Sequence, residues 1–236
     1  MNTLKAQNNI SEISLKNSAI IAGLGLLLMA IIAPIANFVI IQGLIDPTDV
    51  AKTVSNISAS NGLFRLGIGL FMLVALLDII VAWALYIYLI PVNKHLSLLA
   101  AWLRLIYATI LVVVLINLLN VLQLINGADY LTGFSIAQMQ AQVMVSLNIF
   151  THGWEFGLII FGFHLLLLGY LMLKAGYMRK ILGILIILAA FGYLIDGFGK
   201  LLSADYDISI SIYTFIGEVI LIFWLLIKGR KVPEEK

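Results

Sequence analysis

The sequence predicts an all-α integral membrane protein, a bundle of six transmembrane helices with both termini in the cytoplasm. Hydrophobic residues make up 62% of the 236 residues and charged residues only 11%, whereas a soluble domain is about 45–50% apolar and about 25% charged. Six apolar stretches reach the length of about 20 residues that a helix needs to cross a hydrocarbon core of about 30 Å. The basic residues gather on one side of these stretches.

The six expected helices follow a short N-terminal segment, residues 1–17, that is expected to lie in the cytoplasm. The first apolar run exceeds the about 7–15 residues of a signal-peptide core, so it is interpreted as a retained helix. A basic cytoplasmic tail, residues 228–236, follows the last helix. The expected helices cover residues 18–42, 62–90, 98–125, 148–173, 181–202 and 210–227.

The connections between these helices differ in length. Two short connections join the second helix to the third and the fourth to the fifth, which makes two hairpins. Two longer connections lie on the opposite side, and each is expected to contain a further surface helix. In the first, Asp46 and Pro47 provide a cap and a first-turn proline, and apolar residues follow from Val50 at helical spacing. In the second, Ser135 and Gln138 have the spacing of a capping box.

The positive charges give the expected orientation. Of the 14 Lys and Arg residues, all except Lys52, Arg65 and Lys200 fall on the side of the termini. Because basic residues are enriched on the cytoplasmic side of membrane proteins, both termini are expected there. The net charge of +2 gives no indication of nucleic-acid binding, and the lack of cysteine excludes disulfides and thiolate chemistry.

Polar residues inside the expected helices are the candidate functional residues. A charge near the bilayer centre costs roughly 2.5–3.5 kcal/mol, so it faces the bundle interior, a partner or water. With a rise of about 1.5 Å per residue, many of these side chains reach a similar depth in the outer half. The convergence predicts an outward-opening polar cavity, in which a carboxylate is protonated or a cation is bound. The residues expected there are Arg65, Asn117, Asn120, His152, Glu155, Asp196 and Glu218.

A second polar group is expected in the inner half of the bundle. Asp78 and Arg104 lie on one antiparallel hairpin with an offset of about 9 Å, so a direct ion pair requires an extended arginine. His164 lies nine residues beyond Glu155, about 180° round the same helix, and therefore belongs with this deeper group. Structural ion pairs between helices account for such residues as readily as a function does.

A metal site is a further interpretation of the outer group. An imidazole and three carboxylates suit zinc, manganese or iron. Di-iron bundles, however, use Glu-x-x-His pairs from two helices, and this chain has a single pair in the reverse order, His152 and Glu155. No metal and no cofactor is therefore predicted. The chain also lacks the common nucleotide-binding, hydrolase and metalloprotease motifs, so no catalytic residue is assigned.

Several segments resemble a known family. They read NGLFRLGI, PVNKHLSLLA, NGADYLTGFS and the long stretch from HLLLLGYL to GYLID, which ends at Asp196. These segments are similar to small bacterial multi-pass membrane proteins that are catalogued as a domain of unknown function, number 4386. The resemblance covers nearly the whole chain. It implies a multi-pass topology and the bacterial plasma membrane, and it implies no agreed activity. The chain departs at Met178, where proline is expected before the basic residue.

Three functions are compatible with these residues. The first is an outward-facing cavity in the lipid bilayer that binds or transports a small polar or cationic solute, or a proton. The second is a membrane-embedded enzyme that acts on a lipid or exported substrate through His152 and Glu155. The third is a non-catalytic partner or sensor subunit that uses its outer surface helices. The first predicts that Glu155, Asp196 and Glu218 meet, whereas three acids on different sides argue against it. The sequence indicates no oligomeric state.

Overall fold

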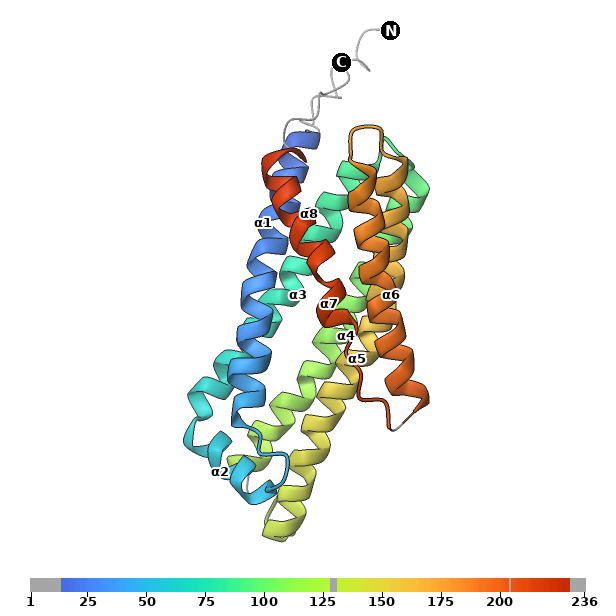
Figure 1. The fold of residues 1–236 in the computed structure, drawn as a ribbon. Coiled ribbons are helices and arrows are strands. Elements are labelled where there is room, and N and C mark those ends of the chain that lie inside the picture. Colours follow the sequence, from blue (N-terminus) through green and yellow to red (C-terminus); the bar gives the residue numbers. More distant parts are fainter. Residues whose placement is uncertain (1–13, 128–130, 204, 230–236) are drawn as a thin grey trace, which may run out of the picture.

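Long helices packed side by side form the protein, which is all-α over residues 14–127, 131–203 and 205–229, the part that the computed structural model describes. Five helical segments in this part are long and apolar enough to cross a membrane, which supports the predicted class of multi-pass membrane protein. The long helices run along one axis, and the start of the first helix lies at the same end of the bundle as the end of the last helix (Figure 1). They are α1 (Leu15–Pro34), α3 (Asn61–Leu89), α4 (Lys94–Ile125), α5 (Ile136–Lys174) and α6 (Lys180–Leu202).

The first span changes its helical type near its far end. Ser14 caps α1 by accepting a hydrogen bond from the backbone N–H of Asn17. Pro34 ends the regular α-helix, since proline lacks the N–H that an α-helical hydrogen bond requires and its ring crowds the preceding turn. A π-helical segment, Ile35–Ile41, follows, and a short 3₁₀ turn completes the span. One side of the π-helical segment, with Ala36, Asn37, Ile40 and Ile41, is buried, whereas Phe38 and Val39 are exposed.

A surface helix follows this span, as the sequence predicts. This helix, α2 (Val50–Ala59), lies at the end of the bundle opposite the start of α1 (Figure 1). Its cap is Asp49, which accepts from the N–H of Lys52, and not the expected Asp46. The side chain of Asp46 instead accepts from the backbone of Thr48 and Asp49 and forms a 2.9 Å ion pair with Lys52. The aspartate therefore shapes the loop before the helix.

The capping box predicted at Ser135 is present, but it begins a single long helix. The Ser135 hydroxyl accepts from the N–H of Gln138, whose side chain accepts from the N–H of Ser135 at 2.8 Å. No break separates the expected surface helix from the expected span at 148–173, and α5 has 39 residues. Gly153 does not interrupt it, because this residue packs directly against Val114 of α4. The helix is about 58 Å long, well beyond a hydrocarbon core of about 30 Å.

The last predicted span, residues 210–227, is broken in the structure. It consists of α7 (Ser211–Thr214) and α8 (Ile216–Ile227), and the chain from 205 to 210 has no helix. Residues Ser211 and Thr214 pack against Gly192, in the middle of α6. The helical part therefore begins halfway along the bundle (Figure 1), and it is shorter than the other spans.

Candidate functional site

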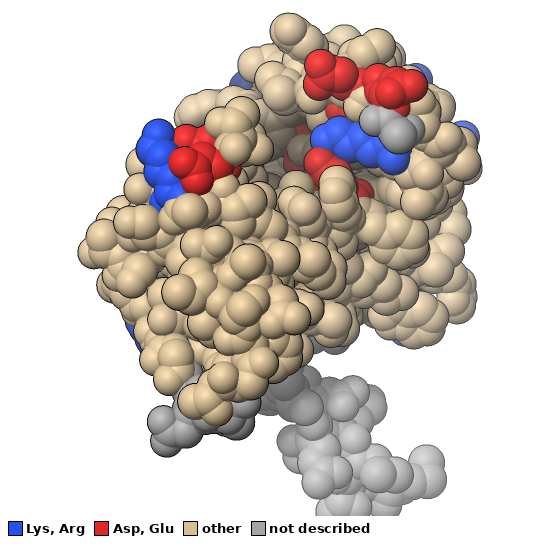
Figure 2. Space-filling view, turned by 90° about the horizontal axis from the view of Figure 1, so that it is seen from below, with Lys and Arg blue, Asp and Glu red and all other residues tan. Residues whose placement is uncertain are grey.

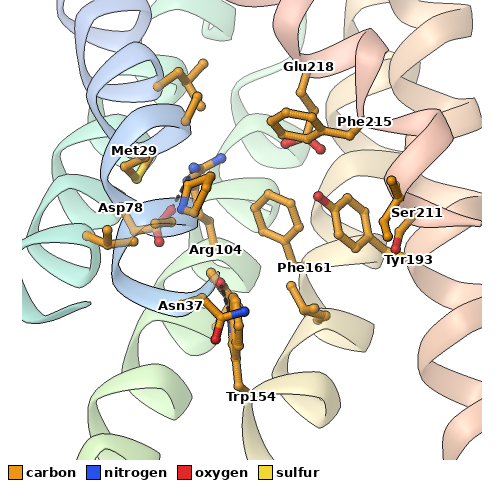
Figure 3. Close-up of a pocket in the computed structure, with 18 of the residues that line it drawn as sticks. Met29, Asn37, Asp78, Arg104, Trp154, Phe161, Tyr193, Ser211, Phe215 and Glu218 are labelled. Carbon is orange, nitrogen blue, oxygen red and sulfur yellow. Dashed lines mark hydrogen bonds and ion pairs between the residues drawn. The ribbon is translucent and has the colours of Figure 1, made fainter. Parts of the chain in front are cut away.

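A cavity of about 350 Å³ lies at the centre of the bundle, where the broken last span leaves the other helices without a full-length neighbour. All the long helices contribute to its walls, together with α7 and α8 (Figure 3). The face opposite the start of α1 is visibly hollowed, with charged groups on two sides of the hollow (Figure 2). Most lining residues are apolar, and the others are Asn37, Asp78, Arg104, Tyr107, Trp154, Tyr193, Ser211 and Glu218.

The π-helical segment of the first span places Asn37 in the cavity wall. This side chain is buried, and its Oδ1 atom has no hydrogen-bond partner among the described residues. π-helical turns are rare and often occur at functional sites, because they alter which side chains face a given direction. The sequence signal for Asn37 is the position of its amide, three residues after Pro34 within an apolar run.

The expected inner group is assembled beside the cavity. Arg104 of α4 forms a 2.7 Å ion pair with Asp78 of α3, and its Nη1 lies 3.3 Å from Nε2 of His164. Nδ1 of His164 lies 2.8 Å from the carbonyl oxygen of Ala100. Because a carbonyl oxygen only accepts, Nδ1 carries a proton, which leaves Nε2 to accept from the guanidinium. The three side chains are almost fully buried, and Nε of Arg104 has no partner in the described structure.

Glu218 faces the cavity from the first turn of α8. The residue is 8% exposed, and its Oε1 lacks a partner within the described residues. The hydroxyl of Tyr193, on α6, points toward the carboxylate (Figure 3). A carboxylate in the first turn of a helix interacts favourably with the helix dipole. The break at Phe215 thus starts a new helix at the depth of the cavity and places an acid in its first turn.

The unpartnered polar atoms share this one location. Over the described part of the chain, three buried side-chain atoms lack a hydrogen-bond partner, namely Asn37 Oδ1, Arg104 Nε and Glu218 Oε1. All three residues line the same cavity. About 90% or more of buried polar groups in proteins are hydrogen-bonded. Three exceptions around one space point to a polar occupant, such as water, an ion or a ligand.

Glu155 lies in a separate ion cluster. It accepts from Nζ of Lys200 at 2.6 Å and lies 3.3 Å from Nδ1 of His152. Lys200 thus pairs with Glu155 of α5 and not with Asp196, the acid four residues before it. The side chain of His152 is 75% exposed, and neither it nor Glu155 lines the cavity.

Asp196 also has partners of its own. Its Oδ1 accepts from the hydroxyl of Tyr206 and the N–H of Ile210, both at 2.9 Å, and its Oδ2 accepts from the N–H of Ser211 at 2.7 Å. These contacts attach the start of α7 to the middle of α6. Asp196 therefore holds the broken span in place and does not line the cavity.

The remaining residues of the expected outer group likewise lie outside the cavity. Nε of Arg65 donates to Asn61 at 2.8 Å, and the amide of Asn120 donates to Ser146 at 2.8 Å. Asn117 donates to a carbonyl of its own helix. Of the seven residues expected in the cavity, Glu218 is the one that lines it. The depths of these residues are similar, but equal depth does not place side chains on the same side of their helices.

The described residues contain no group of three or more His, Cys, Asp or Glu side chains arranged to hold a metal ion. Several cavity residues were not anticipated from the sequence, above all Tyr107, Trp154, Tyr193 and Ser211. Aromatic residues in an apolar helix carry no signal of the side that they face, and Ser211 comes to the cavity through the break in the last span.

Comparison with known proteins identifies relatives without an assigned activity. A family model described as a domain of unknown function, DUF4386, matches residues 21–229. A protein of Archaeoglobus fulgidus, described as uncharacterized, is 39% identical over 167 residues, which cover 71% of this chain and 85% of that protein. This relative is archaeal, so similar chains occur outside bacteria. No solved structure matches the chain significantly. Because the family model covers most of α1 and the whole of every later helix, the chain belongs to the DUF4386 family.

Proposed function

We propose that this protein crosses the membrane six times, with both termini in the cytoplasm, and that its cavity opens outward and binds or transports a small polar or cationic solute. The plasma membrane, as in bacteria, is its proposed location. The packing of Gly229 beside Ala19 supports an even number of crossings, since it brings the start of α1 and the end of α8 to the same side. The hollow on the opposite face supports an outward opening (Figure 2).

The observation that carries the solute site is the shared location of the three unpartnered atoms of Asn37, Arg104 and Glu218. An unsatisfied buried polar group costs roughly 1–3 kcal/mol, so this wall gains stability from an occupant that forms hydrogen bonds. Irregular backbone at membrane depth is tolerated where it lines a cavity. Interrupted helices also form the solute sites of many transporters, and the break before α8 is of this kind.

The charges of the cavity favour a cation or a proton. Asp78 and Arg104 neutralise one another across 2.7 Å. Glu218 has no such partner in the described residues, so the cavity carries one carboxylate in excess. A cationic solute compensates this charge directly, and a proton does so by neutralising the acid. The same wall therefore suits the binding of a cation or the passage of a proton.

Cysteine accessibility tests the orientation and the opening, because the chain has no cysteine of its own. We expect Ser211→Cys, in the cavity, to react in intact cells with a membrane-impermeant thiol reagent. Gly133→Cys, in the exposed outer connection, is the positive control. Gly176→Cys, in the exposed inner connection, should react only after the cells are permeabilised. Labelling of Gly176→Cys in intact cells would refute the orientation. Labelling of Ser211→Cys only after permeabilisation would refute the outward opening.

The preference for positive charge is tested with two reagents of opposite charge. We expect Ser211→Cys to react several-fold faster with a cationic methanethiosulfonate than with an anionic one, because the Glu218 carboxylate attracts the former. The variant Glu218→Gln should remove most of this preference. Glu155→Gln removes a carboxylate outside the cavity and should leave the preference unchanged. An equal effect of the two substitutions would show that general surface charge, and not the cavity, controls the reaction.

A further inference from the structure

Aromatic rings form much of the cavity wall. They belong to Phe38, Tyr107, Trp154, Phe161, Tyr193 and Phe215, which come from the first span, α4, α5, α6 and the turn before α8.

Four of these rings hold one another in place. Nε1 of Trp154 donates to the hydroxyl of Tyr107 at 3.0 Å. The ring of Tyr107 lies 5.0 Å from that of Phe161, which in turn meets Tyr193 edge-on at 5.4 Å. The rings thus form a connected belt whose orientation does not depend on a ligand.

This belt already binds one cation of the protein itself. The guanidinium of Arg104 lies 5.2 Å from the centre of the Phe161 ring. The faces of aromatic rings attract positive charge, and they do so more strongly where water is excluded. The Phe215 ring lies beside the Glu218 carboxylate in the same space (Figure 3). An aromatic face and an unpaired carboxylate are therefore available together near the start of α8.

The rest of the wall offers too few oxygen ligands to bind a bare metal ion. Hard cations such as Ca²⁺ take six to eight oxygen ligands, whereas side chains such as Leu26, Met29 and Val74 make up most of this lining. An organic cation carries its own apolar substituents, which gain free energy when they are buried against such a wall. A volume of about 350 Å³ is at the small end of the range of about 300–1,000 Å³ that is usual for ligand sites.

We propose that the ligand of this cavity is a small organic cation, a substituted ammonium, whose charge lies between the Glu218 carboxylate and the aromatic rings. The inference depends on the proposed function, because it names the chemical class of the solute. It is narrower than that proposal, which also admits neutral polar solutes, inorganic cations and protons.

The test compares two probes that differ by one atom. Choline has a quaternary nitrogen where neohexanol has a neutral carbon, so the pair has nearly the same shape and different charge. We expect the purified full-length protein in lipid nanodiscs to bind choline or tetraethylammonium saturably and at least tenfold more tightly than neohexanol, by isothermal titration calorimetry. Equal or tighter binding of neohexanol, or saturable binding of none of the ammonium probes, would overturn the proposal.

Two substitutions locate the binding in the cavity. Glu218→Gln should weaken binding of the ammonium at least tenfold, and Glu155→Gln should not. Phe215→Leu keeps the apolar volume and removes the aromatic face, so it should weaken binding by about two- to thirtyfold. Phe223→Leu, at an exposed position of α8, is its control. If Glu218→Gln fails to fold, the probe comparison in the unmodified protein and the Phe215→Leu variant still decide the matter.

The two proposals fail in different ways. If Ser211→Cys is accessible from outside but the protein prefers neohexanol, Na⁺ or K⁺ to the ammonium probes, the organic cation is refuted and the outward-facing solute site stands. If Ser211→Cys is inaccessible from outside in intact cells, the proposed function itself fails.

Discussion

The attachment of the broken last span depends on one carboxylate, and its replacement by an amide gives a sharp prediction. In Asp196→Asn, the amide oxygen retains the acceptor role of Oδ1 toward Tyr206 and Ile210. The amide nitrogen then replaces Oδ2 and faces the N–H of Ser211, so the shortest of the three hydrogen bonds, at 2.7 Å, is lost. A hydrogen bond to a charged group contributes roughly 1.5–3 kcal/mol. We expect the local opening of residues 205–214 to become easier by this amount.

Hydrogen–deuterium exchange with mass spectrometry measures this local opening. Because 1.4 kcal/mol corresponds to a factor of ten, the amides of this segment should exchange roughly tenfold to 150-fold faster in Asp196→Asn, while peptides from α4 should not change. Asp207→Asn, an exposed acid in the same connection, is the matched control. Unchanged exchange of the segment in a folded Asp196→Asn protein would refute the view that this carboxylate holds the span.

Three further predictions concern the loop, the helix contacts and the buried ion pair. The hydrogen bond with Lys52 is the chief reason that the pKa of Asp46 is held well below its ordinary range. The stabilisation of the loop by Asp46 should therefore persist at neutral pH and be lost as the pH falls below about 4. Hydrogen exchange of the α2 amides should become faster over this pH range, and Asp46→Asn should abolish the pH dependence. An added Cβ at Gly217 would meet a backbone carbonyl oxygen at 2.6 Å, whereas Gly69 has open space, so Gly217→Ala should lower the free energy of unfolding by about 1–3 kcal/mol and Gly69→Ala should not. Asp78→Asn leaves Arg104 buried without its counter-charge and should cost about 3–5 kcal/mol, while replacement of both by apolar residues should recover most of this loss, as measured by denaturation in detergent.

The bounds of two long helices could be predicted closely because hydropathy specifies them. The expected segments 98–125 and 181–202 correspond to Lys94–Ile125 and Lys180–Leu202, with ends that differ by no more than four residues. The positions of Asp78, Arg104 and His164 along the chain placed them together in a deeper group, but they left a direct ion pair of Asp78 with Arg104 conditional on an extended arginine. Position along a helix axis follows from the constant rise per residue, so it can be calculated from the chain.

The sides that the helices present could not be predicted in the same way. A helix that is apolar all round gives no indication of which side faces lipid, so the similar depths of Glu155 and Glu218 did not reveal their separate surroundings. The break in the last span was hidden for a different reason. Residues 210–227 are apolar enough for a continuous helix, and the break is held by contacts with Asp196, which lies 14 residues earlier. Such a contact belongs to the tertiary structure.

The π-helical segment after Pro34 has a consequence for how this protein tolerates changes in length. A π-helical turn contains more residues than an α-helical turn, so it is equivalent to an insertion in a regular helix. Deletion of one residue between Ile35 and Ile41 would let this turn become α-helical and would leave the rest of the span close to its present orientation, because the wide turn accommodates the residue that is removed. A deletion within the α-helical part of α1 would instead rotate everything that follows by about 100°. Single-residue gaps in alignments within this family should therefore fall in this short segment and not in α1.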